Sequence, residues 1–232
     1  MDVIQDSGIR SEFFKVLSWS PQKRLIEAYK QQFRTEDIEK EHYKWELLRD
    51  QKGKPELGNG QLLEDIKSMN FSNLIYHLSS AVLKELVENF PDEMNTLFAH
   101  LFDENKDLNI RLNYFKKNTK TLYEKLGKTN QHHQDERAIA TYLTFHNPAR
   151  YTFYKSSYYK SYCQMLGIKP TKSGQRLVHY YQLVDDLVNE YIEGDKELRN
   201  LVESNLPNGC DANNMRLIAQ DILFTQLEKK EE

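Results

Sequence analysis

The residues best suited to chemistry lie in one segment, Asn147 to Cys163, with the sequence NPARYTFYKSSYYKSYC. It holds five tyrosines, two lysines and one arginine, and no aspartate or glutamate. Lysine and arginine neutralise the phosphates of nucleic acids, and aromatic rings stack on exposed bases. Tyrosine also offers a hydroxyl to phosphate oxygens. The same residue types fit a tyrosine-rich core with a charged edge, so the segment alone leaves both interpretations open.

Charge is distributed unevenly around this segment. No Asp or Glu occurs over the 48 residues from Arg137 to Val184, which contain seven Lys or Arg. The wider block 108–184 holds 13 basic and 3 acidic residues, a net charge of +10, whereas the remainder of the chain carries −13. Such polarity suits a polyanionic partner, but a basic block can equally pair with the acidic block of its own chain.

Helical spacing divides the tyrosines between core and surface. If a helix begins just before Tyr158, then Tyr158, Tyr162 and Met165 share one face, which predicts packing. Tyr159 and Lys160 fall outside that stripe and are expected to face a partner. The predicted DNA-binding residues are therefore the basic residues of this region and one tyrosine: Arg150, Lys155, Tyr159, Lys160, Lys169, Lys172 and Arg176.

Catalytic signatures are missing from the sequence. It contains no GxxxxGK[ST] phosphate loop and no GxSxG, GxGxxG or HExxH motif. Glu56, Asp65 and Lys67 have a nuclease-like spacing, because two carboxylates and a lysine could position a magnesium ion. That arrangement requires a hairpin, whereas the flanking residues favour helix. We therefore expect no catalytic residues, no enzyme activity and no cofactor.

Metal, redox and membrane signals are also weak. His132 and His133 precede Asp135, but adjacent histidines on a helix point in different directions, so a capped helix start is expected there and no metal site. Cys163 and Cys210 fit no metal or redox spacing, which favours a reduced, cytoplasmic setting. No apolar run approaches the roughly 20 residues that span a bilayer, and the first ten residues do not resemble a secretory signal.

Composition predicts the elements that must position these side chains. Gly and Pro together make up only 15 of 232 residues, and Leu, Lys, Glu and Gln are plentiful, which favours helix. The expected fold class is mainly α, a multi-helix globular domain with at most a short extended segment near 151–154. An acidic helical region, 1–107, and a helical region 108–232 that contains the basic block 108–184 are expected to pack as one globular unit.

Start and stop signals predict where the helices lie. The region 12–52 is expected to be helical, with Ser20 as an N-cap before Pro21. Glycines and prolines mark loops at 52–60, 169–175 and 203–214. Further helices are expected at 61–89 (two, meeting near 70–72), from Pro91, at 108–126 before Gly127, at 134–146 before Asn147-Pro148, from 156 or 157 to Gly167, at 176–192 and at 215–227.

The segment HHQDERAIATYLTFHNPARYTFYK resembles the N-terminal region of McrB-like bacterial restriction proteins, AAA-family ATPases or GTPases with a variable N-terminal domain. The shared pattern is a His-x-Gln-Asp start, RAI, a short helix ending in proline, and an aromatic YxxYK. The matching residues are His133, Gln134, Asp135, Arg137, Ala138, Ile139, Pro148, Tyr151, Tyr154 and Lys155. The segments HYKWELL, LFDENKDLNIRLNYF and AQDILF fit the same family, so the resemblance covers most of the chain.

The resemblance implies a region that precedes a nucleotide-hydrolysing module and recognises DNA or a partner. The expected function is a non-enzymatic recognition domain of a McrB-like restriction or anti-phage defence protein that binds DNA through its basic, tyrosine-rich surface. The implied partners are DNA, an AAA-family motor module and a nuclease subunit. The alternative is a protein–protein assembly or partner-docking domain, in which the −13 remainder meets the +10 block of a neighbouring copy; the oligomeric state stays open.

Overall fold

Helices account for the regular secondary structure of the residues that the computed structural model describes, 20–35 and 42–228. No strand occurs within those residues, which confirms the mainly α prediction. The helices are α2 (Pro21–Thr35), α3 (Tyr43–Gln51), α4 (Leu62–Ser68), α5 (His77–Asn89), α6 (Pro91–Phe102), α7 (Leu108–Lys125), α8 (Glu136–His146), α9 (Ser156–Met165), α10 (Arg176–Leu187), the π-helix η2 (Val188–Ile192), α11 (Lys196–Asn205) and α12 (Met215–Leu227).

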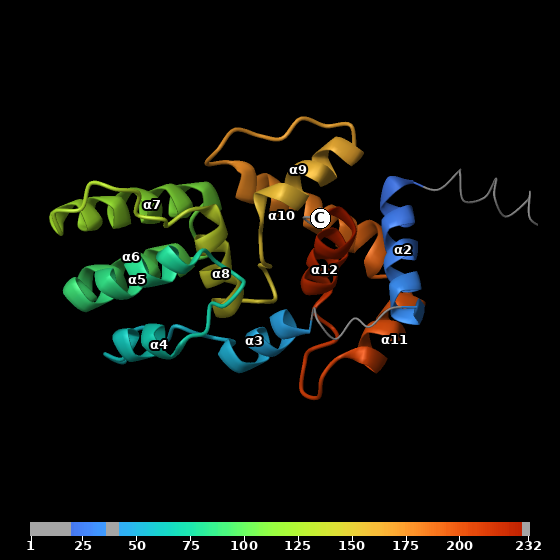
Figure 1. Ribbon diagram of the computed structural model, residues 1–232, viewed down its shortest axis with the longest axis horizontal. Coiled ribbons are helices and arrows are strands. Elements are labelled where there is room, and N and C mark those ends of the chain that lie inside the picture. Colours follow the sequence, from blue (N-terminus) through green and yellow to red (C-terminus); the bar gives the residue numbers. More distant parts are fainter. Residues whose placement is uncertain (1–19, 36–41, 229–232) are drawn as a thin grey trace, which may run out of the picture.

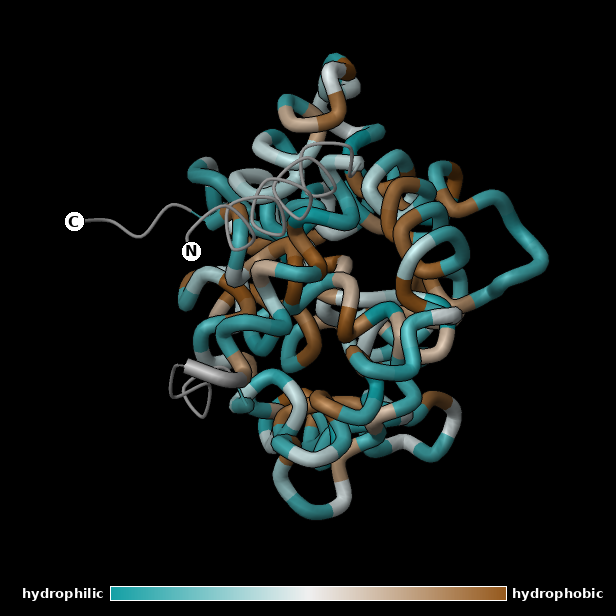
Figure 2. The backbone as a smooth tube through the Cα atoms, turned by 90° about the vertical axis from the view of Figure 1, so that its right-hand side faces the viewer, coloured by the Kyte–Doolittle hydropathy of each residue, from teal (hydrophilic) through white to brown (hydrophobic). Residues whose placement is uncertain are grey.

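The helices lie in two groups joined through the middle of the molecule. Helices α4 to α7 form one end, α2 and α11 form the other, and α12 lies between them (Figure 1). Helix α12 packs against α2, α9 and α10. The charge boundary at 107/108 falls between α6 and α7, which pack on each other with the rings of Phe98 and Phe115 5.2 Å apart. Buried apolar side chains from both charge regions form one continuous core, and hydrophilic positions follow the outer loops (Figure 2).

Side-chain caps satisfy the first turns of several helices, and two of these caps, Ser20 and Asp135, were predicted. Ser20 accepts a hydrogen bond from the N–H of Lys23 at 3.2 Å and so caps α2 as predicted. An Asp or Asn oxygen satisfies free N–H groups in the first turn of four further helices, and these caps are Asp107 (α7), Asp135 (α8), Asp195 (α11) and Asn214 (α12). Gly127 and Gly167 follow α7 and α9 with φ of +72° and +70°, which confirms both predicted helix ends.

Three features differ from the predicted elements. Helices α4 and α5, expected to meet near 70–72, are separated by the non-helical residues 69–76. Helix α11 was not expected, and its last residues fall in a segment predicted as loop. Its apolar residues Leu198, Leu201 and Val202 have the spacing of one helix face, and Leu198 and Val202 are buried, so the sequence does contain a short helical pattern there. The predicted helix 176–192 changes at Val188 into a π-helix, where the N–H of Glu193 donates to the Val188 carbonyl. The parts of the predicted region 12–52 at 12–19 and 36–41 lie outside the described residues.

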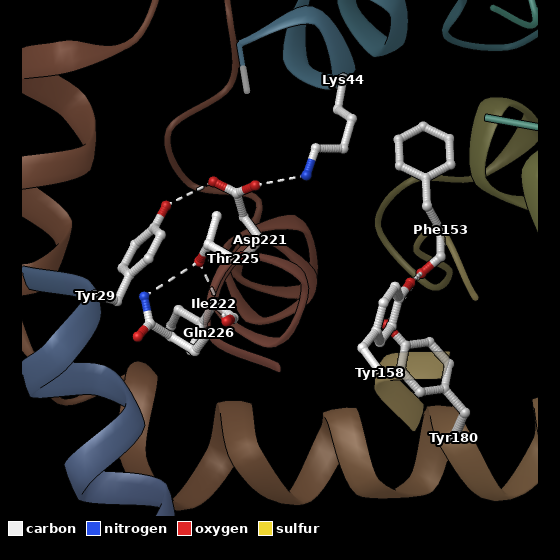
Figure 3. A network of polar contacts seen from close by, with 9 residues as sticks. All are labelled: Tyr29, Lys44, Phe153, Tyr158, Tyr180, Asp221, Ile222, Thr225 and Gln226. Atoms are coloured by element: carbon white, nitrogen blue, oxygen red, sulfur yellow. Dashed lines mark hydrogen bonds and ion pairs between the residues drawn. The ribbon is translucent and has the colours of Figure 1, made fainter. Parts of the chain in front are cut away.

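The aromatic segment 151–155 crosses the interior as neither helix nor strand. Its backbone carbonyls bond to tyrosine hydroxyls instead of to a partner strand. The hydroxyls of Tyr158 and Tyr180 both donate to the Phe153 carbonyl, at 2.8 and 3.0 Å (Figure 3), and the hydroxyl of Tyr181 donates to the Thr152 carbonyl at 3.2 Å. A buried carbonyl without a partner costs about 1–3 kcal/mol. Many of the tyrosines therefore serve the core.

A buried ion pair joins three helices at the other side of α12. Lys44 Nζ on α3 lies 2.7 Å from one carboxylate oxygen of Asp221 on α12, and both side chains are buried. The other oxygen of Asp221 accepts a hydrogen bond from the Tyr29 hydroxyl on α2 at 2.7 Å (Figure 3). The Lys44 ammonium also lies 3.9 Å from the ring centroid of Phe224, a favourable cation–π position.

Candidate nucleic-acid interface

Tyr159 is fully buried, so the prediction that it faces a partner is wrong. Its hydroxyl accepts a hydrogen bond from the N–H of Thr171 at 3.0 Å and lies 2.9 Å from Nδ1 of His179. Burial raises the pKa of this hydroxyl. Helical spacing along α9 does not reveal this burial, because α9 is covered on two sides: Tyr158 contacts Phe224 of α12, while Tyr159 contacts α10 and the loop before it. Tyr159 thus anchors a loop.

The anchored loop, 166–175, carries two of the predicted DNA-binding lysines. It arches over the top of the molecule from the end of α9 to the start of α10 (Figure 1). Lys169 and Lys172 lie in this loop and Lys160 follows Tyr159 on α9; all three are exposed. We call Lys160, Lys169 and Lys172 the basic rim. No described carboxylate pairs with any of the three in a salt bridge, so their charge is available to a partner.

Arg150 and Lys155 differ from the basic rim because acids already pair with them. Arg150 Nη1 lies 2.5 Å from a carboxylate oxygen of Glu104. Lys155 pairs with Glu228, whose second oxygen accepts a hydrogen bond from Ser157 at 2.6 Å. A cation held by an internal carboxylate has to lose that partner before it neutralises a phosphate. These two predicted residues therefore have a weaker physical case than the basic rim.

Arg176 supports the loop from its far end. Its side-chain Nε donates to the Thr171 carbonyl at 3.2 Å. The backbone N–H groups of Arg176 and Leu177 both donate to one carboxylate oxygen of Glu136, at 3.1 and 3.4 Å. The negative charge of this carboxylate also interacts favourably with the positive, N-terminal end of the α10 dipole. Arg176 is half-buried and positions the loop.

The residues that hold the loop of the basic rim in place could not be predicted from the sequence. Thr171, His179 and Glu136 meet partners that lie 12, 20 and 40 residues away in the chain. A pattern read along the sequence identifies helix faces but not which loop crosses them. The sequence feature that marks this region is the absence of Asp and Glu between Arg137 and Val184.

The two adjacent histidines face different neighbours. His132 is half-buried, and burial lowers its pKa; a hydrogen bond to the Lys116 backbone partly opposes this shift, while the charges of Lys116 and Lys120 add to it. His133 instead lies against Tyr76, with ring centroids 5.2 Å apart. Among the described residues, no three His, Cys, Asp or Glu side chains are grouped so that they could hold a metal ion.

The nuclease-like set is not assembled. The Asp65 carboxylate accepts a hydrogen bond from the backbone N–H of Glu56 at 2.8 Å. Lys67, two residues further along α4, pairs instead with Glu88 of α5 at 3.8 Å. Residues two apart on a helix do not share a face. Asp65 therefore contacts the backbone of Glu56, whereas the Glu56 carboxylate accepts a hydrogen bond from Asn59 at 3.2 Å, and Lys67 is paired elsewhere.

Comparison with protein-family models, with curated proteins and with solved structures finds no match to this chain. In the described part of the chain, no helix is both long enough and apolar enough to cross a membrane.

Proposed function

We propose that this protein is a DNA-recognition domain that binds phosphates through the basic rim and performs no reaction of its own. The observation that carries the proposal is the pairing pattern of the cations. Arg150 and Lys155 are held by acids, whereas the basic rim projects from a loop and α9 without a described carboxylate partner. Exposed, uncompensated lysines on an anchored loop suit a polyanion, because binding releases counterions without breaking internal ion pairs.

The proposed setting is a McrB-like restriction or anti-phage defence system in the cytoplasm. Its support is the resemblance of the segment from His133 to Lys155 to the N-terminal regions of those proteins. In that setting an AAA-family motor module and a nuclease subunit supply hydrolysis and cleavage, and this region selects the DNA. The proposal that the basic rim binds DNA does not depend on that setting, because exposed lysines can neutralise phosphates without a motor module or a nuclease subunit.

Fluorescence polarisation with a labelled DNA duplex at low salt tests the proposal. Replacing Lys160, Lys169 and Lys172 together with Ala should weaken binding strongly. It should also reduce the slope of log affinity against log salt by about 2 to 3, because three phosphate contacts are lost. The matched control replaces three exposed cations outside the block 108–184: Arg24, Lys52 and Lys196. No duplex binding at low salt, or an equal loss in the control, would falsify the proposal.

Tyr159→Phe separates anchoring from base stacking. A buried anchor predicts that this variant keeps its ring packing but loses the hydroxyl contacts to Thr171 and His179. Amide hydrogen exchange in 168–175 should therefore become faster. Any loss of DNA affinity should then result from the looser loop and not from a lost contact between Tyr159 and DNA. A stacking tyrosine would leave the exchange unchanged.

A second candidate function is partner docking or self-assembly, the alternative that the charge asymmetry left open. The observation that favours it is Ile168, an exposed apolar side chain next to Lys169 in the same loop. Aliphatic side chains add little to phosphate binding but contribute to protein interfaces. Sedimentation velocity at low and high salt tests this reading: a salt-sensitive oligomer that is lost in Ile168→Ser, without DNA affinity, would replace the first proposal.

A further inference from the structure

A cavity of about 490 Å³ lies beside the connection between α4 and α5, apart from the basic rim. This volume is within the range of small-molecule sites. The lining residues that matter for chemistry are Asn70, Ser72, Tyr76, His77, Lys84 and Arg137. The lining includes no Asp or Glu, whereas the cavity beside Tyr191 contains Glu27, Glu190 and Asp195. The charge of this cavity therefore favours an anion.

Arg137 is held rigidly at the edge of the cavity. Its Nε donates to the Leu74 carbonyl at 2.6 Å and its Nη2 donates to the Asn73 carbonyl at 2.8 Å. Neither bond uses Nη1. Asn73 has a φ of +63°, a left-handed conformation that a non-glycine residue seldom adopts, and the Arg137 bond stabilises the turn there. The guanidinium thus places a fixed positive charge beside the cavity.

Tyr76 contributes an exposed aromatic ring to the lining of the same cavity. Its side chain is 47% exposed, although the residue stands in a cluster of rings. The centroid of its ring lies 4.3 Å from that of His77 and 5.2 Å from that of His133. These neighbours limit the rotation of Tyr76. Stacking of a ligand ring on Tyr76 therefore costs little additional side-chain entropy.

Lys84 completes the set of groups that a nucleotide would need. It is a half-buried lysine on α5 that lines the cavity, and no described carboxylate forms a salt bridge with it. Nearby, the Asn70 amide N–H groups and the Ser72 hydroxyl offer hydrogen bonds of the kind that a base edge uses, while the Asn70 amide oxygen already accepts from the Ser72 N–H at 2.9 Å. We infer that this cavity binds one nucleoside monophosphate unit, with its base on Tyr76 and its phosphate between Lys84 and Arg137.

Two sources supply such a unit: a free nucleotide, or one nucleotide of an unpaired nucleic-acid strand. The second source deepens the proposed function and rests on it, whereas binding of a free nucleotide does not. The two sites are separate but share support at the start of α8, because Glu136 caps α10 beside the basic rim and the next residue, Arg137, holds the cavity edge.

Isothermal titration calorimetry of the full chain with 5′-AMP, adenosine and inorganic phosphate tests the inference. We expect saturable binding of 5′-AMP, with adenosine and phosphate each at least about tenfold weaker because each lacks one half of the contacts. Tyr76→Ala and Lys84→Ala should each weaken 5′-AMP binding by about tenfold or more, and Tyr76→Phe should retain it.

Matched controls are available on α7. Tyr114 is an exposed tyrosine that stacks on His100, and Lys117 is an exposed lysine; neither lines the cavity. Tyr114→Ala and Lys117→Ala should leave 5′-AMP affinity unchanged. An equal loss in these controls, or no saturable binding of 5′-AMP, overturns the inference.

A single-stranded oligonucleotide of about ten residues distinguishes the two sources. If the source is a strand, the oligonucleotide binds at least about tenfold more tightly than 5′-AMP, competes with it and loses affinity in Tyr76→Ala. If the source is a free nucleotide, Tyr76→Ala weakens 5′-AMP alone. Replacing the three lysines of the basic rim should not change 5′-AMP binding in either case, so failure at the basic rim and failure at this cavity are separable.

Discussion

Glu136 and Arg137 are consecutive residues in the first turn of α8, and their side chains support two different surfaces. The Glu136 carboxylate accepts hydrogen bonds from the first N–H groups of α10, whereas the Arg137 guanidinium donates to the carbonyls of Asn73 and Leu74. One helix turn therefore fixes both the loop of the basic rim and the edge of the cavity next to Tyr76. Both proposed binding surfaces depend on the position of this turn.

Removal of the Glu136 carboxylate should destabilise the start of α10. Glu136→Ala leaves two N–H groups of α10 without their acceptor, so we expect a loss of about 0.5–2 kcal/mol in the free energy of unfolding. Glu136→Gln keeps an acceptor oxygen and should lose only about 0.3–1 kcal/mol, the part due to charge at a helix N-terminus. Urea unfolding followed by circular dichroism measures both. Glu124→Ala, at an exposed pair on α7, is the control and should change stability by less than about 1 kcal/mol.

Tyr158 and Tyr180 should show non-additive stability effects, because both hydroxyls donate to the Phe153 carbonyl. Tyr158→Phe and Tyr180→Phe alone should each cost about 1 kcal/mol, since the carbonyl keeps one donor. The double variant should cost more than the sum of the two, by about 1 kcal/mol or more, because the buried carbonyl then loses both. A double-mutant cycle by urea unfolding measures the coupling. Additive losses would show that the carbonyl finds another donor.

Removing one charge of the Lys44–Asp221 pair should lower the free energy of unfolding more than removing both charges. Asp221→Asn keeps an oxygen for the Tyr29 hydroxyl but removes the negative charge next to the buried ammonium of Lys44. We expect a loss of about 3–5 kcal/mol in the free energy of unfolding.

The double variant Lys44→Met with Asp221→Asn should recover much of that loss, because no charge is then buried at this position. Thermal and urea unfolding of both variants check the prediction. A loss below about 1 kcal/mol in Asp221→Asn would mean that the pair contributes as little as an exposed one.

Acid should destabilise the protein in part through His146. Its ring stacks on Phe102 with centroids 3.8 Å apart, and its Nδ1 is buried without a described hydrogen-bond partner. Burial lowers the pKa of His146 below its usual 6.5, and the Glu104 carboxylate only partly opposes this. As the pH falls below about 6.5, the unfolded chain takes up the proton before the folded one does, so this contribution to stability is lost towards acid.

His146→Phe keeps a ring against Phe102 and removes the titrating group. Stability measured from about pH 7 to about pH 5 should therefore fall less steeply in this variant than in the natural chain. Burial lowers the pKa values of His100 and His132 as well, so some acid sensitivity should remain. Identical slopes would show that His146 does not contribute.

Local sequence signals were enough to predict most of the helices. Proline at the start of α2 and α6, glycine after α7 and α9, and Asp135 before α8 act within a few residues, so their effect does not depend on the rest of the fold. The packing of Tyr158 and Tyr162 was predictable for the same reason, since helical spacing defines a shared face. Helix α11 was not predicted, although Leu198, Leu201 and Val202 mark one face of it, because only these three apolar residues carry the pattern.

The amino-acid sequence was sufficient to predict the fold class, most helix positions and the acid-free run that contains the basic rim. Which cations remain unpaired depends on long-range packing, because Glu104 and Glu228 reach Arg150 and Lys155 from 46 and 73 residues away. Long-range packing also makes Tyr159 an anchor, because α10 and its preceding loop cover a helix face that α9 alone would leave open. The cavity at Tyr76 likewise exists only where α8 meets the turn before α5. Contacts between distant segments follow from packing, and no pattern along the chain specifies them.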